Sequence, residues 1–291
     1  MEKTIQIENE RMQIEISNVG AEPVLLWDKK QARNVLWRGD PRFWKRHDPI
    51  LFPNVGKMYR NEFRHQGNLY TTSQHGFARD RVFSCIVREK DKVVHRLVSD
   101  DATRENYPFD FALAVIHKLE GNSLWVEWQV TNTGKQPMYF TIGGHPAFSL
   151  LKNSLNKDAY ELLFPGTESL VYHLIDPQIG NPRPGETQVL TLQDHRLPLS
   201  DALFQKDALI FDDGQISEVQ LWHQDGTRLV TLNAEGFPNF GIWSVAKAPF
   251  VCLEPWIGRT DDAGFKDDIS QKPGITIVDP GQCFSSHYTI T

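Results

Sequence analysis

The stretch DFALAVIHKLEGNSLWVEWQVTNTG, residues 110–134, alternates apolar and polar side chains on both sides of a Gly-Asn pair. Alternation with a period of two is typical of a strand with one buried face, and Gly-Asn is a turn signal between two such strands. The stretch therefore predicts a long antiparallel hairpin. TIQIENERMQIEIS, residues 4–17, shows the same pattern around its Glu-Asn-Glu turn, so the chain begins as sheet.

Strand patterns of this kind fill most of the chain. Gly-Asn, Asp-Gly and Pro-Gly turn signals separate them at intervals of roughly ten residues, as in large sandwiches. Helical patterns are limited to residues 40–46 and residues 101–108, where Asp101 is expected to cap a single turn. The Pro- and Gly-rich residues 176–185 are expected to form a surface loop, because strand patterns continue on both sides. The sequence thus predicts an all-β fold, a large antiparallel sandwich with few short helices.

The composition allows one or two domains, and we expect a single domain covering residues 1–291. A chain of 291 residues with 40% hydrophobic and 23% charged residues can bury a full core, and all-β sandwiches of this size are often one domain. The formal net charge of -6 lacks the basic excess that nucleic-acid binding requires. No segment approaches the ~20 apolar residues of a membrane helix, and the N-terminus has no apolar core of the signal-peptide type. We therefore expect a cytoplasmic monomer or homodimer that binds neither nucleic acid nor membrane.

The cysteines predict no cross-linked framework. Cys85, Cys252 and Cys283 are scattered, odd in number and without CxxC spacing, so neither a disulfide scaffold nor a zinc knuckle is indicated. We expect reduced, mostly buried thiols.

Other segments set one or two polar groups among apolar, Gly and Pro residues. They are DPILFPNVGKMYRNEF (48–63), QHGFARDRVF (74–83), TIGGHPAF (141–148), KDALIFDD (206–213) and FVCLEPWIG (250–258). A single histidine near a turn, such as His75 or His145, is more often a hydrogen-bonded structural residue than a functional one, and Asp207 can simply begin a strand. Glu254 is different, because a carboxylate in an apolar run must be paired, hydrogen-bonded or protonated. Such surroundings are typical of working acids and bases.

Taken together, these segments resemble the aldose 1-epimerase (galactose mutarotase) family, most closely its LacX-like branch. HGFAR, GGHPAF and CLEPW, in that order and at these separations, carry the resemblance, which extends over nearly the whole chain. It implies a galactose mutarotase-like β-supersandwich with a cleft across one sheet. It also implies cofactor-free interconversion of the α and β anomers of a hexose.

The resemblance implies a role for each matched residue. Glu254 in CLEPW matches the general base, and His145 in GGHP matches the general acid. His75 in HGFAR matches a second active-site histidine that binds substrate, and Asp207 in KDALIF matches an aspartate that hydrogen-bonds sugar hydroxyls. No metal or nucleotide is expected, which is consistent with the lack of P-loop, GxGxxG and HExxH patterns.

One residue departs from the family pattern. Where the family commonly has an arginine after the glycine of the early loop, this chain has Lys57, which cannot make arginine's forked contact, so Arg60 is a candidate substitute. Arg79 and Trp256 are further candidates for substrate binding. Trp44, Phe77, Trp243 and Trp256 could all present flat faces to a sugar, but we expect at most two of them to do so.

Three alternatives remain open. The protein could bind carbohydrate without turning it over. The substrate could be a hexose 6-phosphate, with its phosphate held by Lys57, Arg60, Arg79 or Arg259. His75, His145 and Glu254 could form a two-histidine, one-carboxylate metal site, although the short HxH or HxD spacing usual for such sites is absent.

Overall fold

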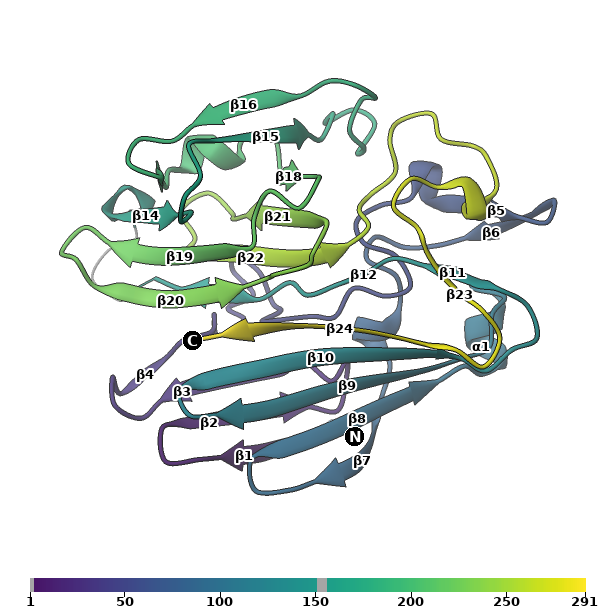
Figure 1. The fold of residues 1–291 in the computed structure, drawn as a ribbon, viewed down its shortest axis with the longest axis horizontal. Helices are drawn as coiled ribbons and strands as arrows, with labels where there is room; N and C mark the ends of the chain where they lie inside the picture. The colour runs from purple at the N-terminus through teal and green to yellow at the C-terminus, as the bar shows by residue number, and fades with distance from the viewer. Residues whose placement is uncertain (1–2, 151–155) are drawn as a thin grey trace.

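The computed structural model describes residues 3–150 and 156–291, and its regular secondary structure is almost entirely antiparallel strands (Figure 1), which confirms the predicted all-β class. The largest sheet has nine strands. Their spatial order is β17 (Arg196–Pro198), β14 (Tyr160–Leu163), β19 (Glu218–His223), β20 (Arg228–Asn233), β24 (Cys283–Ile290), β10 (Ser123–Asn132), β9 (Phe111–Glu120), β8 (Lys92–Val98) and β7 (Ser84–Arg88).

A second sheet of seven strands faces part of the first. Its order is β12 (Ile142–Gly143), β22 (Phe250–Ile257), β21 (Asn239–Trp243), β18 (Leu209–Phe211), β15 (Ser169–Leu174) and β16 (Gln188–Thr191), with β13 (Ala147–Ser149) also paired to β22. The remaining strands form a four-stranded sheet and two short ladders. They are β1 (Thr4–Glu8), β2 (Met12–Ser17), β3 (Pro23–Asp28) and β4 (Arg33–Asn34); β5 (Glu62–His65) with β6 (Asn68–Thr71); and β11 (Met138–Phe140) with β23 (Thr276–Val278).

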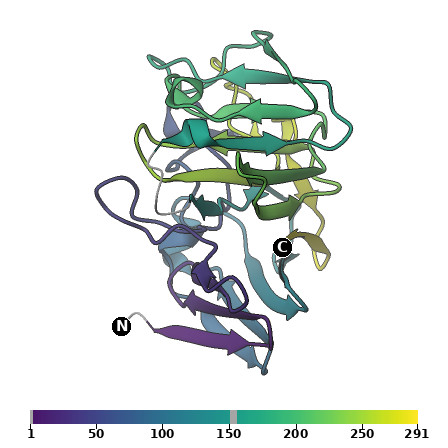
Figure 2. The same cartoon turned by 90° about the vertical axis from the view of Figure 1, so that its left-hand side faces the viewer.

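The two hairpins first identified in the sequence are confirmed. β9 and β10 pair in register from Phe111 opposite Asn132 to Glu120 opposite Ser123, and the turn between them contains Gly121 with φ of 58°. β1 and β2 pair in the same way at the start of the chain. Alternate side chains of these strands enter one hydrophobic core shared by the three larger sheets. Figure 2 shows the N-terminal strands at one end of the molecule and the strands of the middle of the chain at the other.

Helical structure is scarcer than the sequence suggests. Residues 40–46 form a single turn and no helix, because the carbonyl of Asp40 accepts both the Phe43 and the Trp44 N–H at 3.0 Å and the chain then extends. The one α-helix among the described residues, α1 (Asp101–Arg104), is capped by Asp100 and not by Asp101; the Asp100 carboxylate accepts the N–H of Thr103. The 3-10 helices are Tyr59–Asn61, Ala78–Asp80, Lys157–Ala159, Asp201–Phe204 and Ile269–Gln271. No described helix could span a membrane.

The cysteines also differ from expectation. Only Cys252, on β22, is buried, whereas Cys85 and Cys283 are exposed because they occupy solvent-facing positions of β7 and β24. All three are free thiols.

Two glycines on the strands that flank β22 make room for the Trp256 side chain. Gly143 on β12 lies opposite Trp256 of β22, and a Cβ added there would lie 2.4 Å from Cδ1 of the indole. A Cβ added to Gly241 on β21 would lie 2.3 Å from Cζ2, at the other end of the ring system. The indole therefore lies flat across the sheet, over both flanking strands, where any larger residue would displace it.

Replacing either glycine should thus destabilise the protein through Trp256. We expect Gly143→Ala or Gly241→Ala to lower the free energy of unfolding by about 1–3 kcal/mol, the usual cost of overpacking. The same change made in a Trp256→Ala background should cost much less, because the clashing ring is gone. Urea denaturation followed by circular dichroism measures both; strictly additive effects would show that the ring is not the cause.

Candidate active site

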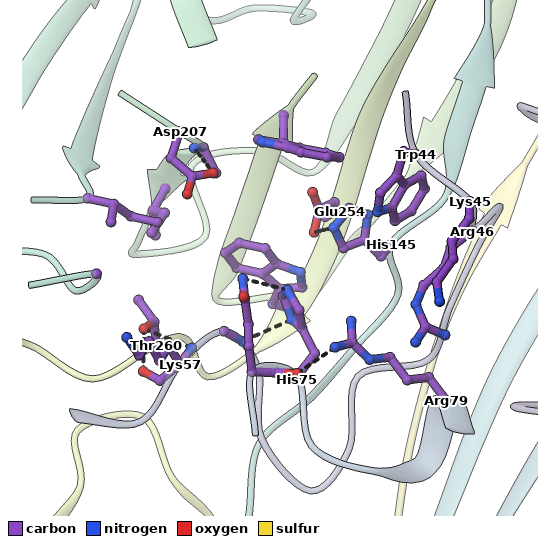
Figure 3. Close-up of a pocket in the computed structure, with 18 residues that line it drawn as sticks. Trp44, Lys45, Arg46, Lys57, His75, Arg79, His145, Asp207, Glu254 and Thr260 are labelled. Atoms are coloured by element: carbon purple, nitrogen blue, oxygen red, sulfur yellow. Dashed lines mark hydrogen bonds and ion pairs between the residues drawn. The ribbon is translucent and has the colours of Figure 1, made fainter. Parts of the chain in front are cut away.

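A cavity of about 620 Å³ opens over the seven-stranded sheet and holds most of the residues singled out in the sequence. Its walls come from segments far apart in the chain: the loop before Asp48, the HGFAR loop, the loop between β12 and β13, and strands β18, β21 and β22. The residues that line it include the predicted set of Lys57, His75, Arg79, His145, Asp207, Glu254 and Trp256. The structure therefore brings all seven predicted site residues to one cavity (Figure 3).

Glu254 and His145 face each other at the floor of this cavity. Glu254 lies on β22, only 1% exposed, with Gly241 opposite it on β21. On the other side of β22, the ladder is interrupted between β12 and β13, and His145 occupies the interruption. His145 Nε2 lies 3.3 Å from Glu254 Oε2. The pairings of β12 and β13 with β22 leave a gap between Gly143 and Ala147, and this gap places His145 opposite the Glu254 carboxyl group.

The surroundings of this pair favour its uncharged form. Burial raises the pKa of Glu254 well above its ordinary value, and the carboxylate of Asp207 acts in the same direction. Burial lowers the pKa of His145 to about 3, and the charge of Arg79 adds to this effect. Both shifts favour the neutral carboxyl group and the neutral imidazole over the ion pair.

His75 presents a hydrogen-bond donor to the cavity. Its Nδ1 accepts the backbone N–H of Gly56 at 3.1 Å, so the neutral ring carries its hydrogen on Nε2. Burial, with the nearby His145 and Arg79, lowers the pKa of His75 well below its ordinary value, which keeps the ring neutral. The backbone of His75 has φ of 66°, and this unusual conformation turns the side chain at the start of the HGFAR loop.

Asp207 and Lys57 lie on the side of the cavity away from Arg79 (Figure 3). Asp207 is exposed, with φ of 72°, and its carboxylate accepts the N–H of Ala208 at 2.9 Å. The backbone carbonyl of Lys57 accepts hydrogen bonds from Asn181 Nδ2 at 2.8 Å and Thr260 Oγ1 at 2.6 Å. Asn181 is fully buried, so the largely exposed loop 176–185 is also an anchor for the cavity wall.

A cluster of cations forms the opposite wall, and we call Lys45, Arg46 and Arg79 the basic wall. Arg46 pairs with Asp80 at 2.7 Å, and Arg79 donates to the carbonyl of Gln74 at 2.7 Å. Burial and the charge of Arg46 lower the pKa of Arg79 to about 10. Two of these cations, Lys45 and Arg46, were missed in the sequence, where WKRHD gives no sign of a loop that folds over a cavity.

Two of the arginines considered for phosphate binding, Arg60 and Arg259, do not line the cavity. Arg60 is exposed and its guanidinium lies over the Tyr59 ring, so it does not replace a loop arginine in contact with a ligand. Arg259 is held by Asp212 at 2.9 Å and by Asp262 at 2.7 Å. Phosphate binding by either residue is therefore not supported.

The aromatic candidates divide in the same way. Trp44, Trp243 and Trp256 line the cavity, and Trp44 stacks on the His145 ring with centroids 4.8 Å apart. Phe77 packs instead against core rings such as Phe52 and is not a lining residue.

Some buried polar atoms of the lining residues lack a hydrogen-bond partner within the described part of the chain. They are Arg79 Nε, His145 Nδ1, Trp256 Nε1 and Glu254 Oε2, the last of which has only the 3.3 Å contact with His145 Nε2. Other described residues, such as His95 and His117, have similar atoms away from the cavity. Buried polar atoms are normally satisfied, so those that line the cavity are available to a polar ligand.

The metal-site alternative takes a different form in the structure. The described residues that could share an ion are His145, Cys252 and Glu254, whose donor atoms lie within 4.8 Å of one another. His75 is not in this group. The alternative set of two histidines and one carboxylate is therefore not assembled among the described residues.

Comparison with known proteins identifies relatives of this chain and of its fold. The family model described as Aldose 1-epimerase matches residues 3–276. The chromosomal protein LacX of Lactococcus lactis is 31% identical over 99% of both chains. A galactose mutarotase related enzyme from Lactobacillus acidophilus has a TM-score of 0.93 at 30% identity, covering 99% of this chain and 97% of its own. A galactose mutarotase-like protein from Lactobacillus casei has a TM-score of 0.90 at 31% identity, covering 99% of both. The predicted mutarotase-like fold is confirmed.

Behind the site, the ionisation of Asp48 should link stability to pH. Burial and the nearby Glu22 raise the pKa of Asp48 from 3.8 to about 7. A raised folded-state pKa stabilises the protein fully below the unfolded pKa, and this contribution is lost as pH rises to about 7. Asp48→Asn cannot titrate, so the stability of wild type relative to the variant should fall by roughly 4 kcal/mol between about pH 4 and pH 8. Urea denaturation across this range tests the expectation, and a constant difference would contradict it.

Proposed function

The chain belongs to the aldose 1-epimerase family, and we propose that it interconverts the α and β anomers of a hexose through proton transfer by Glu254 and His145. The observation that carries the proposal is the 3.3 Å contact between these two side chains at the floor of the cavity. A volume of about 620 Å³ is within the range of small-molecule sites.

The chemistry requires one base and one acid. Glu254 removes the proton of the hydroxyl on C1, His145 protonates the ring oxygen, and the bond between C1 and that oxygen breaks to leave a free aldehyde. After rotation about the C1–C2 bond, the two groups exchange roles and the ring closes on the other face. The pair holds one proton before and after each step, so no net charge leaves the site.

The protonation state that burial favours for Glu254 and His145 requires one proton transfer before this cycle begins. Because burial favours a proton on the carboxyl group, that proton must first pass from Glu254 to His145 across the 3.3 Å contact as the sugar binds. Sugar hydroxyls and the indole N–H of Trp256, which lies near the carboxylate, can stabilise the charge that develops. A desolvated carboxylate is a strong base, which gives the apolar setting of Glu254 its purpose.

The other lining residues would bind and orient the sugar. His75 offers its Nε2–H to a hydroxyl, and Asp207 offers acceptors from the opposite side. Of the lining residues Trp44, Trp243 and Trp256, we expect at most two to supply apolar faces for the C–H side of the ring. A protein that only binds carbohydrate would use the same contacts, so turnover is the discriminating measurement.

Glu254→Gln keeps the shape of the side chain and removes its basicity. We expect kcat for anomer exchange, followed by polarimetry or NMR, to fall by ~10²–10⁴, and His145→Asn to cause a comparable loss. The double variant should be little worse than either single variant, because the two groups act in one step. Sugar binding should stay within about tenfold of wild type, since most hydroxyl contacts come from elsewhere.

Glu218→Gln and His223→Asn are matched controls, because both residues lie on β19, outside the cavity. They should leave kcat unchanged. If folded Glu254→Gln kept more than about a tenth of wild-type kcat, the proposed base would be wrong. If wild type bound sugars but did not accelerate exchange, the protein would be a carbohydrate-binding module.

The basic wall favours a phosphorylated hexose as a second candidate substrate. Lys45, Arg46 and Arg79 gather on one side of the cavity in a protein of net charge -6, and Asp80 is the carboxylate paired with Arg46. Arg79 has a buried Nε without a hydrogen-bond partner among the described residues, 3.8 Å from Asp80 Oδ2. Adjacent guanidinium groups repel each other, and a phosphate between them would relieve that repulsion.

Variants of the basic wall distinguish the two substrates. Arg79→Ala or Arg46→Ala should raise KM for hexose 6-phosphates by about 10-fold to 100-fold more than KM for free hexoses, the worth of a charge-assisted contact. Arg60→Ala, an exposed arginine outside the cavity, is the control. Equal effects on both substrates would exclude a phosphate at the basic wall, and a selective effect of Lys57→Ala would move it to the other side.

A further inference from the structure

A buried polar contact joins the nine-stranded sheet to the segment behind the active-site loop. Tyr288, on β24 of the nine-stranded sheet, is 2% exposed, and Asp48 is 4% exposed. The Tyr288 hydroxyl donates to the Asp48 carboxylate, at 3.2 Å from Oδ2 and 3.4 Å from Oδ1. Neither side chain lines the large cavity, so neither can touch a substrate there.

Both side chains reach the backbone that carries His145. The Asp48 carboxylate lies close enough to the backbone N–H of His145 for that N–H to lower the pKa of Asp48. The Tyr288 hydroxyl lies against Gly144, where an added Cβ would be only 2.9 Å from it. On the opposite side, the Gly144 N–H donates to the carbonyl of Pro255 at 3.1 Å. The peptide before His145 is thus held between β22 and the Asp48–Tyr288 pair.

The Asp48 segment is itself fixed from behind. Glu22 Oε1 accepts the backbone N–H of His47 at 2.6 Å and of Asp48 at 3.2 Å. Leu51 exchanges backbone hydrogen bonds with Gly143, at 2.8 and 3.1 Å. These hydrogen bonds hold the Asp48 segment in place. Loss of the Asp48 or Tyr288 contact would therefore release the loop that carries His145 on that side only.

Building on the proposed function, we propose that Asp48 and Tyr288 are positioning residues that set the direction of the His145 imidazole toward Glu254 and the ring oxygen. The peptide plane before a residue fixes where its side chain points, and a misplacement of about 1 Å can cost about 10²-fold in rate. The function of the pair is to accept and direct one N–H. A neutral acceptor at residue 48 can do this as well as a charged one.

Tyr288→Phe and Asp48→Ala test the proposal together with Asp48→Asn. We expect Tyr288→Phe to lower kcat by about tenfold and Asp48→Ala by about 10-fold to 100-fold, with KM within about twofold of wild type. Asp48→Asn, which keeps the acceptor, should retain most of the activity. Tyr107→Phe is the matched control: its buried hydroxyl donates to the Tyr139 carbonyl at 2.9 Å, away from the cavity, so it should lose stability without losing kcat.

Several results would overturn the proposal that Asp48 and Tyr288 position His145. Unchanged kcat per folded molecule in Tyr288→Phe and Asp48→Ala, or a rise in KM alone, would overturn the proposal. Equal damage in Asp48→Asn and Asp48→Ala would assign the effect to charge and would also overturn it. The ¹H–¹⁵N NMR signals of the histidine rings give a readout independent of activity: in Tyr288→Phe the His145 signals should shift while those of the buried His95 stay in place. This readout remains valid even if wild type proves not to be an epimerase.

Discussion

A carboxyl group dehydrated at the centre of a β-sheet is the constraint on which the rest of the structure depends. Glu254 is 1% exposed on β22, which pairs with β21 on one side and with β12 and β13 on the other. A carboxyl group so deeply buried needs a polar partner. His145 is that partner, and it lies at the break between β12 and β13, opposite Glu254.

Both sheets contribute residues that hold the Glu254–His145 pair in place. The seven-stranded sheet supplies Glu254 and the flat seat of Trp256, which requires glycine at residues 143 and 241. The nine-stranded sheet supplies Tyr288, which reaches through the core to the loop that carries His145. The geometry of the pair therefore depends on how the sheets stack as well as on the strands that bear it.

The sequence predicted what is local or carried by a motif. Period-two alternation located the hairpins, because the apolar residues of each strand mark the face that is buried. The apolar run around Glu254 identified the carboxyl group. It could not place Arg46, whose position depends on an ion pair with Asp80 across 34 residues of chain. Nor could it single out Tyr288, which occupies an ordinary inward position of β24. Contacts between loops and between sheets leave no periodic signal in either partner.

The burial of Glu254 lowers the stability of the fold while it favours the proposed chemistry. A carboxyl group with one oxygen unpaired and almost no exposure costs folding free energy that an uncharged or apolar side chain of similar size would not. Active-site residues of this kind are where stability and activity trade against each other. In a library screened for heat resistance alone, residue 254 should therefore be among the first to change, and a search for thermostable forms of this protein has to keep that position fixed by selection for turnover.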